Sequence, residues 1–273
     1  MKEEVKKLRE EGHSYSEIAE RIGKSRKFAW RHSKDTSFTN NGLKRYQKEV
    51  KGILKQIKPQ SNTLLPQKVR IIGHLLFDGT VYKTKYNHIA RYINSSKELI
   101  CQFVSDMKKI YGITPTSLEV FKGKNNLNCY KVSFSCKALY YDLTNYFKSY
   151  STSNQNIKIP NIIINSGREI KLEFLRTFFE DEGSISSNYR IMGDLKNKII
   201  MQQIVNMLKE FGLFFKLCKY EEYTGYMYKI YLLKTKENLV RFYNLGFFDK
   251  ATITHGKNLG RKKADVLIDF IKK

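Results

Sequence analysis

The chain has 273 residues, of which 41% are hydrophobic and 13% aromatic, and this composition excludes a disordered protein. It is long enough to form one large or two smaller packed domains. Its 50 basic residues against 26 acidic ones give a formal net charge of +24. Because each phosphate neutralised by Lys or Arg releases condensed counterions, this charge favours nucleic acid as the partner; a basic surface without a partner is the alternative.

The four cysteines (Cys101, Cys129, Cys136 and Cys218) have no CxxC spacing and no histidine cluster beside them, so neither a zinc site nor a disulfide framework is expected. The N-terminus is charged and has no apolar signal-peptide segment. No stretch has the length and apolar character of a membrane span. We therefore expect a soluble, intracellular protein of the cytoplasm or nucleoid that does not bind a membrane. We also expect it to be a monomer.

Residues 1–60 are predicted to form a small helical domain. In "SYSEIAERIGKSRKFAWRHSK" (14–34), Ala19 is followed four residues later by Gly23, a spacing typical of a helix-turn-helix, which needs a small residue where the helices touch and a tolerant one in the turn. The second helix would present Arg26, Lys27 and Arg31 to DNA. An ordinary basic helical hairpin is the alternative. The apolar spacing of "GLKRYQKEVKGILKQIK" (42–58) predicts a connecting amphipathic helix.

From residue 66 onward the chain repeats one pattern twice. "KVRIIGHLLFDG" (68–79) and "KLEFLRTFFEDEG" (171–183) are apolar helical runs that end in an acid followed by glycine. After each run, the sequence predicts two strands, a helix (95–112 and 195–212), two more strands, and a closing helix (137–149 and 235–247). We therefore expect two α-β-β-α-β-β-α halves at 66–150 and 168–273, the second with a C-terminal helix, joined by a linker at 151–167.

The nonapeptides "IIGHLLFDG" (71–79) and "LRTFFEDEG" (175–183) resemble the two signature motifs of single-chain LAGLIDADG homing endonucleases. The resemblance implies an α+β fold with pseudo-two-fold symmetry, in which two antiparallel sheets form a saddle over DNA. It also implies that the two signature helices pack together at the centre, with Gly73 and Thr177 where they touch. His74, Thr177 and the Glu of the second motif depart from the family pattern.

In the family, the C-terminal ends of these helices bring one carboxylate each to a shared point, here Asp78 and Glu182. Two close carboxylates repel, so the arrangement is favourable only where divalent cations such as Mg²⁺ or Mn²⁺ bind them. Paired metals about 3.5–4 Å apart can activate water and stabilise a leaving oxygen. Lys158 and Lys257 are the candidates for the basic residue that the family places near each metal. Alternatively, both acids are ordinary turn residues.

Strand alternation predicts which side chains face the DNA. Lys131 lies opposite the buried positions of "YKVSFS" (130–135), and Lys229 lies opposite those of "YKIYLL" (228–233), so these lysines are candidate phosphate contacts. In each half, further polar residues after the motif are expected to lie on one face of the strand: Ser184, Ser186, Asn188 and Arg190 in the second half, and Tyr82 and Thr84 in the first.

Glu180 and Asp181 precede Glu182 at the end of the second apolar run, and they are expected to be solvated or paired with basic groups.

Together these features predict a site-specific, metal-dependent DNA endonuclease that makes a double-strand break in a long target. We expect a free-standing enzyme, with an intron as the expected location of its gene. A non-cleaving transcription regulator or RNA-splicing helper on the same fold is the main alternative, and an RNA-processing nuclease is a third. The two acids favour an enzyme, because a protein that only binds gains nothing from carboxylates that face phosphates.

Overall fold

The computed structural model describes residues 1–43, 45–46, 57–58, 60, 63–186, 188, 190–222 and 225–272. The chain divides into two compact units, Met1–Gln56 and Ile57–Lys273. Most of the amphipathic helix expected at 42–58 lies outside the described residues. Within the described residues, none of the helices combines the length and apolar character that a membrane crossing needs.

The N-terminal unit contains the helices α1 (Lys2–Glu10), α2 (Tyr15–Arg21) and α3 (Arg26–Ser33). Its small core contains the fully buried Val5, Ile18 and Ala29, one from each helix. The start of α2 is fixed by a capping box, in which the Ser14 hydroxyl accepts from the Glu17 amide and the Glu17 carboxylate accepts from the Ser14 amide.

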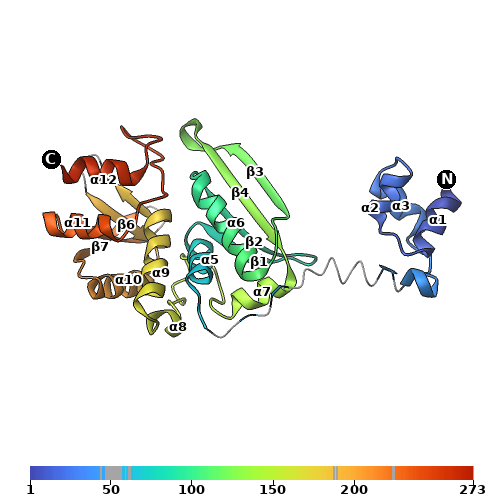
Figure 1. The fold of residues 1–273 in the computed structure, drawn as a ribbon, viewed down its shortest axis with the longest axis horizontal. Helices are drawn as coiled ribbons and strands as arrows, with labels where there is room; N and C mark the ends of the chain where they lie inside the picture. The colour runs from blue at the N-terminus through green and yellow to red at the C-terminus, as the bar shows by residue number, and fades with distance from the viewer. Residues whose placement is uncertain are drawn as a thin grey trace. The chain divides into compact units, whose positions relative to one another are not determined.

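The larger unit contains the predicted repeat, and the α+β prediction is confirmed (Figure 1). Each half has the order α-β-β-α-β-β-α. The first half consists of α5 (Pro66–Phe77), β1 (Gly79–Lys83), β2 (His88–Asn94), α6 (Lys97–Tyr111), β3 (Ser117–Lys122), β4 (Asn128–Ser135) and α7 (Lys137–Thr144). The short α8 (Asn161–Ile164) follows. The second half consists of α9 (Arg168–Asp181), β5 (Gly183–Ile185), β6 (Ile191–Leu195), α10 (Lys198–Glu210), β7 (Phe215–Glu222), β8 (Gly225–Leu232) and α11 (Lys236–Asn244), and α12 (Lys263–Ile271) comes after it.

The described strands form two four-stranded antiparallel sheets with equivalent strand orders, β1-β2-β4-β3 and β5-β6-β8-β7. One face of each sheet packs against helices, because alternate residues such as Val132, Phe134 and Ile230 are buried in the core. The residues between them point to the opposite face, which we call the open face of the sheet.

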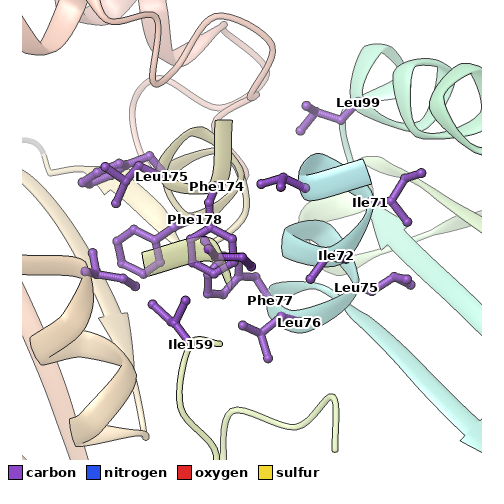
Figure 2. Packing of buried hydrophobic residues seen from close by; sticks show 14 of the residues in the cluster. Ile71, Ile72, Leu75, Leu76, Phe77, Leu99, Ile159, Phe174, Leu175 and Phe178 are labelled. Carbon is purple, nitrogen blue, oxygen red and sulfur yellow. The ribbon is translucent and has the colours of Figure 1, made fainter. Parts of the chain in front are cut away.

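Helices α5 and α9 lie side by side at the centre of this unit, with one sheet on either side (Figure 1). Their contact is largely apolar: Phe77 from α5 packs on Phe174 and Phe178 from α9, with ring centroids 5.6 and 5.4 Å apart (Figure 2). Near the helix N-termini, Arg70 of α5 donates to Glu173 of α9 at 2.8 Å and to both carboxylate oxygens of Asp106 at 2.8 Å. This buried ion pair fixes how the two helices are aligned.

The two central helices are in close contact where Gly73 faces Thr177. A Cβ atom on Gly73 would overlap the Thr177 hydroxyl, so glycine is needed for lack of space. Thr177 is fully buried, and its hydroxyl donates to the Phe174 carbonyl at 2.7 Å. The close contact places the C-terminal ends of both helices next to each other.

Gly73→Ala should therefore destabilise the larger unit by about 1–3 kcal/mol, the usual cost of overpacking a core. Thr177→Ala in the same chain should recover much of that loss, because it removes the hydroxyl and methyl group that the new Cβ meets. Urea unfolding followed by near-ultraviolet circular dichroism measures both effects. Gly167→Ala is the control, because nothing lies within 4 Å of its Cβ position. An equal loss in single and double variants would show that this contact does not limit the approach.

Candidate active site

A cavity of about 540 Å³ lies where the ends of α5 and α9 meet the open faces of both sheets. Asp78 and Glu182 line it, each at the C-cap of one central helix. In both halves the acid is followed by a glycine that begins a strand, and a Cβ on either glycine would overlap the backbone of the preceding helix. The repeat thus brings one carboxylate from each half to the same cavity.

Both carboxyl groups are electrostatically destabilised as anions. Burial raises the pKa of Asp78 well above its ordinary value, and the charge of Asp181 raises it further. Burial likewise raises the pKa of Glu182, and there the charges of Asp78 and Asp181 add to the effect. Desolvation and like charge are both relieved when a cation binds between such groups.

Asp181 belongs to this cluster as well, and it links the two halves. Its Oδ2 atom lies 2.8 Å from His74 Nδ1 on α5, and its Oδ1 atom accepts from the Tyr92 hydroxyl at 2.7 Å. Asn94 Nδ2 donates to Asp181 Oδ1 and to Asp78 Oδ2, both at 3.1 Å. Asn94 thereby orients the carboxylate of Asp78 relative to the end of α9.

Glu180 and Asp181 were expected to be either solvated or paired with basic groups, and solvation is wrong, whereas both acids do lie beside the His74 ring, at 3.7 and 2.8 Å. Glu180 is buried, and the side chain of Asp181 is fully buried between the central helices. Burial lowers the pKa of His74 to about 4, so the ring is neutral at pH 7 and its Nδ1–H donates to Asp181. Burial raises the pKa of Glu180 to about 7. The prediction from sequence was wrong because three successive acids at the end of a helix are usually exposed, and the residues that bury them here are distant along the chain.

Lys263 also lines the cavity. It stands at the start of α12, is buried, and donates from Nζ to the backbone carbonyls of Glu180 at 3.2 Å and Gly183 at 2.5 Å. Burial lowers its pKa to about 8, although the charges of Asp181, Asp78 and the two neighbouring glutamates oppose the shift. It is therefore mostly protonated at pH 7 and offsets the negative cluster.

Neither of the candidates from sequence, Lys158 and Lys257, lines this cavity. Lys158 is exposed because its neighbours Ile157 and Ile159 are buried and the extended chain turns the lysine outward. Lys257 is exposed in the segment before α12. Sequence reasoning missed Lys263 because only the docking of α12 brings it to the acids; one available signal was a lysine at the start of an apolar helical run.

The donor set suits a hard divalent cation shared with a substrate. Asp78 and Glu182 provide carboxylate oxygens, which are the ligands that Mg²⁺ and Mn²⁺ accept. Among the described residues, no group of three His, Cys, Asp or Glu side chains is arranged to hold an ion on its own. Water and phosphate oxygens would have to complete the coordination, as is usual for Mg²⁺.

The open face of the first sheet carries polar and charged side chains. Arg91 donates to the Tyr82 hydroxyl at 3.0 Å and to the Ser133 hydroxyl at 3.4 Å. Lys131 lies on the same face and pairs with Glu119 at 2.6 Å. Arg91, which was not predicted from the sequence, therefore lies beside Tyr82 on this open face. Glu119 partly neutralises the charge of Lys131.

The open face of the second sheet combines aromatic and basic residues. Lys229 Nζ lies 5.3 Å from the ring centroid of Tyr220, and the Arg190 guanidinium lies 5.3 Å from that of Tyr231. Lys216 is exposed and pairs in register with Tyr231 on this face. Cations held against aromatic rings are positioned at low entropic cost, which suits contacts to a phosphate backbone.

Not all residues expected on one strand face lie on it. Only Ser184 lies within β5; Ser186 and Arg190 close a hairpin by backbone and side-chain hydrogen bonds of 3.0 and 3.1 Å, and Asn188 is in the turn between them. Thr84 likewise follows β1 and accepts from the Asn87 amide at 3.0 Å. The predicted strands were too long because serine and threonine hydroxyls satisfy the turn backbone instead of continuing the ladder.

Three further candidates, Arg26, Lys27 and Arg31, are exposed on α3 of the N-terminal unit.

Comparison with known proteins agrees with this architecture. Residues 169–245 match the family described as LAGLIDADG-like domain. A mesophilic variant of the homing endonuclease I-DmoI is similar in structure, with a TM-score of 0.51 at 18% identity over 66% of this chain and 94% of that one. I-DmoI in complex with DNA and Mn gives 0.50 at 17% identity over 66% and 95%, and I-DmoI with DNA and Ca gives 0.50 at 15% over 75% and 97%. At these low identities, the structural similarity shows a shared fold and nothing further. No curated protein sequence matches the chain.

Proposed function

We propose that this chain, whose residues 169–245 match the LAGLIDADG-like domain family, is a divalent-metal-dependent endonuclease that makes a double-strand break in a long DNA target. The observation that carries the proposal is the convergence of Asp78 and Glu182, one from each half, on a single cavity between the two open faces. A protein that only binds DNA would be weakened by desolvated carboxylates at this point.

Each residue of the site has a role in this proposal. Asp78 and Glu182 would hold the cation, and Asn94 orients the Asp78 carboxylate through the 3.1 Å hydrogen bond. A Mg²⁺ held there would supply Lewis acidity toward the phosphate and activation of the attacking water. Lys263 keeps a positive charge beside the acids. It lowers the cost of holding them ionised before the cation binds.

The substrate is proposed to be double-stranded DNA, held on the two open faces. The net charge of +24 and the basic residues among tyrosines on the second sheet suit a phosphate backbone. I-DmoI, which is similar in fold, has been solved in complex with DNA and Mn. Since both acids come from one chain, we propose that the protein acts as a monomer.

The test uses a plasmid library that carries random or genomic inserts. Incubation with the full chain and Mg²⁺ should yield linear plasmid from a small subset of inserts, and EDTA should prevent it. Mn²⁺ should substitute for Mg²⁺.

Binding of DNA without nicking, in Mg²⁺ or Mn²⁺ at low salt, would contradict the endonuclease and leave the transcription regulator or RNA-splicing helper. Cleavage of structured RNA but not of DNA under the same conditions would identify an RNA-processing nuclease instead. When an acid of the site is substituted in this test, the control must be an acid outside the cavity. Asp194 lines the cavity and is therefore unsuitable. Glu237 on α11 is exposed, so Glu237→Gln is a suitable control.

A further inference from the structure

The outer face of α3 carries a stripe of exposed residues that the nuclease site does not use. Lys27, Trp30, Arg31 and Lys34 follow one another at helical i, i+3, i+4 and i+7 spacing, so they share one face. All four are exposed, and Trp30 keeps 48% of its surface accessible. The opposite face of α3 carries Ala29, which is fully buried in the core of the N-terminal unit.

Charge is segregated within this unit. Among the described helices α1 to α3, the acidic residues lie on α1 and α2, and no Asp or Glu occurs between Glu20 and Asp35. The stripe on α3 is therefore purely cationic apart from its single aromatic ring. Lys34 Nζ lies 5.5 Å from the centroid of the Trp30 ring, which keeps a positive charge next to the apolar surface.

The connection between α2 and α3 is short, as in a helix-turn-helix. It is a short turn, Ile22–Ser25, in which Gly23 has φ +62°, and nothing lies within 4 Å of its Cβ position. Glycine is therefore needed there for its backbone conformation and not for space. The Ser25 hydroxyl then accepts from the Phe28 amide at 3.2 Å and starts α3.

We propose that α2 and α3 form a helix-turn-helix whose α3 stripe, Lys27, Trp30, Arg31 and Lys34, binds the major groove of double-stranded DNA. This contact is separate from the proposed nuclease function and does not require cleavage. The three cations would contact phosphates, and Trp30 would lie against base edges, where its ring suits thymine methyl groups and its N–H can donate. Because both units belong to one chain, binding by one raises the effective concentration of the other near the same DNA.

Trp30 is the only tryptophan in the chain, so its fluorescence reports directly on this face. The experiment titrates the full chain carrying Asp78→Asn, to prevent cleavage, with a random-sequence DNA duplex of about 40 base pairs, long enough for several helical turns. The fluorescence anisotropy of the labelled DNA measures binding, and the Trp30 emission should change in parallel with it. An RNA duplex of the same length should leave the emission unchanged, because its major groove is too narrow to admit a helix.

The salt dependence gives a second readout. Lys27→Ala with Arg31→Ala should reduce the slope of log affinity against log salt by about 2, since each phosphate contact contributes about 0.9. Lys2→Ala with Lys7→Ala, two exposed lysines on α1, is the matched control and should leave the slope unchanged. Unchanged Trp30 emission on bound DNA, equal slopes for both pairs, or an equal response to the RNA duplex would overturn the proposal.

Discussion

Asp78→Asn and Glu182→Gln should each reduce DNA cleavage by at least about 10³-fold and leave DNA binding within about threefold of the parent. Metal-assisted charge stabilisation contributes several kcal/mol to such reactions, and each 1.36 kcal/mol is a factor of ten in rate. The double variant should lose little more than either single one, because the two acids hold one shared cation centre and act as a unit. Single-turnover cleavage of the selected plasmid target measures the loss.

Binding should survive because an amide removes a negative charge near the phosphates and occupies the same volume. Glu237→Gln, an exposed acid on α11, is the matched control and should cleave at the parent rate. Retained cleavage in Asp78→Asn would contradict the assigned site. Parallel loss of binding and cleavage would instead indicate that the fold was damaged.

The same substitutions should alter stability in a direction that follows from the pKa shifts. In the folded protein, the pKa values of Asp78 and Glu182 are raised by burial and by neighbouring acids. The folded state therefore binds more protons than the unfolded state, and stability is lost as pH rises from ordinary carboxyl values through the raised ones. In EDTA at pH 8, the double amide variant should melt at a higher temperature than the parent.

A divalent cation should reverse this order. Mg²⁺ should raise the melting temperature of the parent, because it binds the folded site and not the unfolded chain, and should have little effect on the double variant. This readout does not depend on cleavage. An equal rise in both proteins would show that the ion does not bind at Asp78 and Glu182.

The sequence was sufficient to predict the repeated architecture because its signals are local and occur twice. Apolar runs of helical spacing, strand alternation and an acid-glycine pair recur in the same order in both halves. The position of Gly73 opposite Thr177 was inferred from the motif pattern, and the structure places them in contact.

What the sequence could not provide was the environment of side chains whose partners are distant along the chain. Asp181 meets His74, Tyr92 and Asn94 only after the two halves pack together. Lys263 reaches the acids only because α12 docks beside β5. Neither partner set can be identified from periodicity or composition, although a lysine at the start of the apolar run of α12 was a signal for Lys263 itself. The ends of the strands were predicted wrongly for a related reason. The hydroxyl groups of Thr84 and Ser186 accept hydrogen bonds from backbone amides in the turns, and strand propensity does not reveal these bonds.

Loss of the Lys263 charge should strongly destabilise the larger unit. Its ammonium group is buried, and Asp78, Glu180, Asp181 and Glu182 all raise its pKa against the effect of burial. Removing one partner of a buried charge cluster leaves the others uncompensated, at a cost of about 3–5 kcal/mol. Lys263→Met keeps most of the apolar side-chain length and should therefore lower the unfolding free energy at pH 7.5 by about that amount.

The neighbouring residue provides the control for this prediction. Lys262 is about half exposed and pairs with Glu98 at 2.8 Å on the surface, so Lys262→Met should cost less than about 1 kcal/mol. The difference between Lys263→Met and the parent should shrink as pH falls from 8 to 5, because the raised pKa values of the acids let them become neutral and the missing cation is then no longer needed. Adding Asp181→Asn to Lys263→Met should recover part of the loss at pH 7.5 for the same reason. A loss that is equal at pH 5 and pH 8 would mean that Lys263 contributes through packing alone, and the electrostatic account of the cluster would then be wrong.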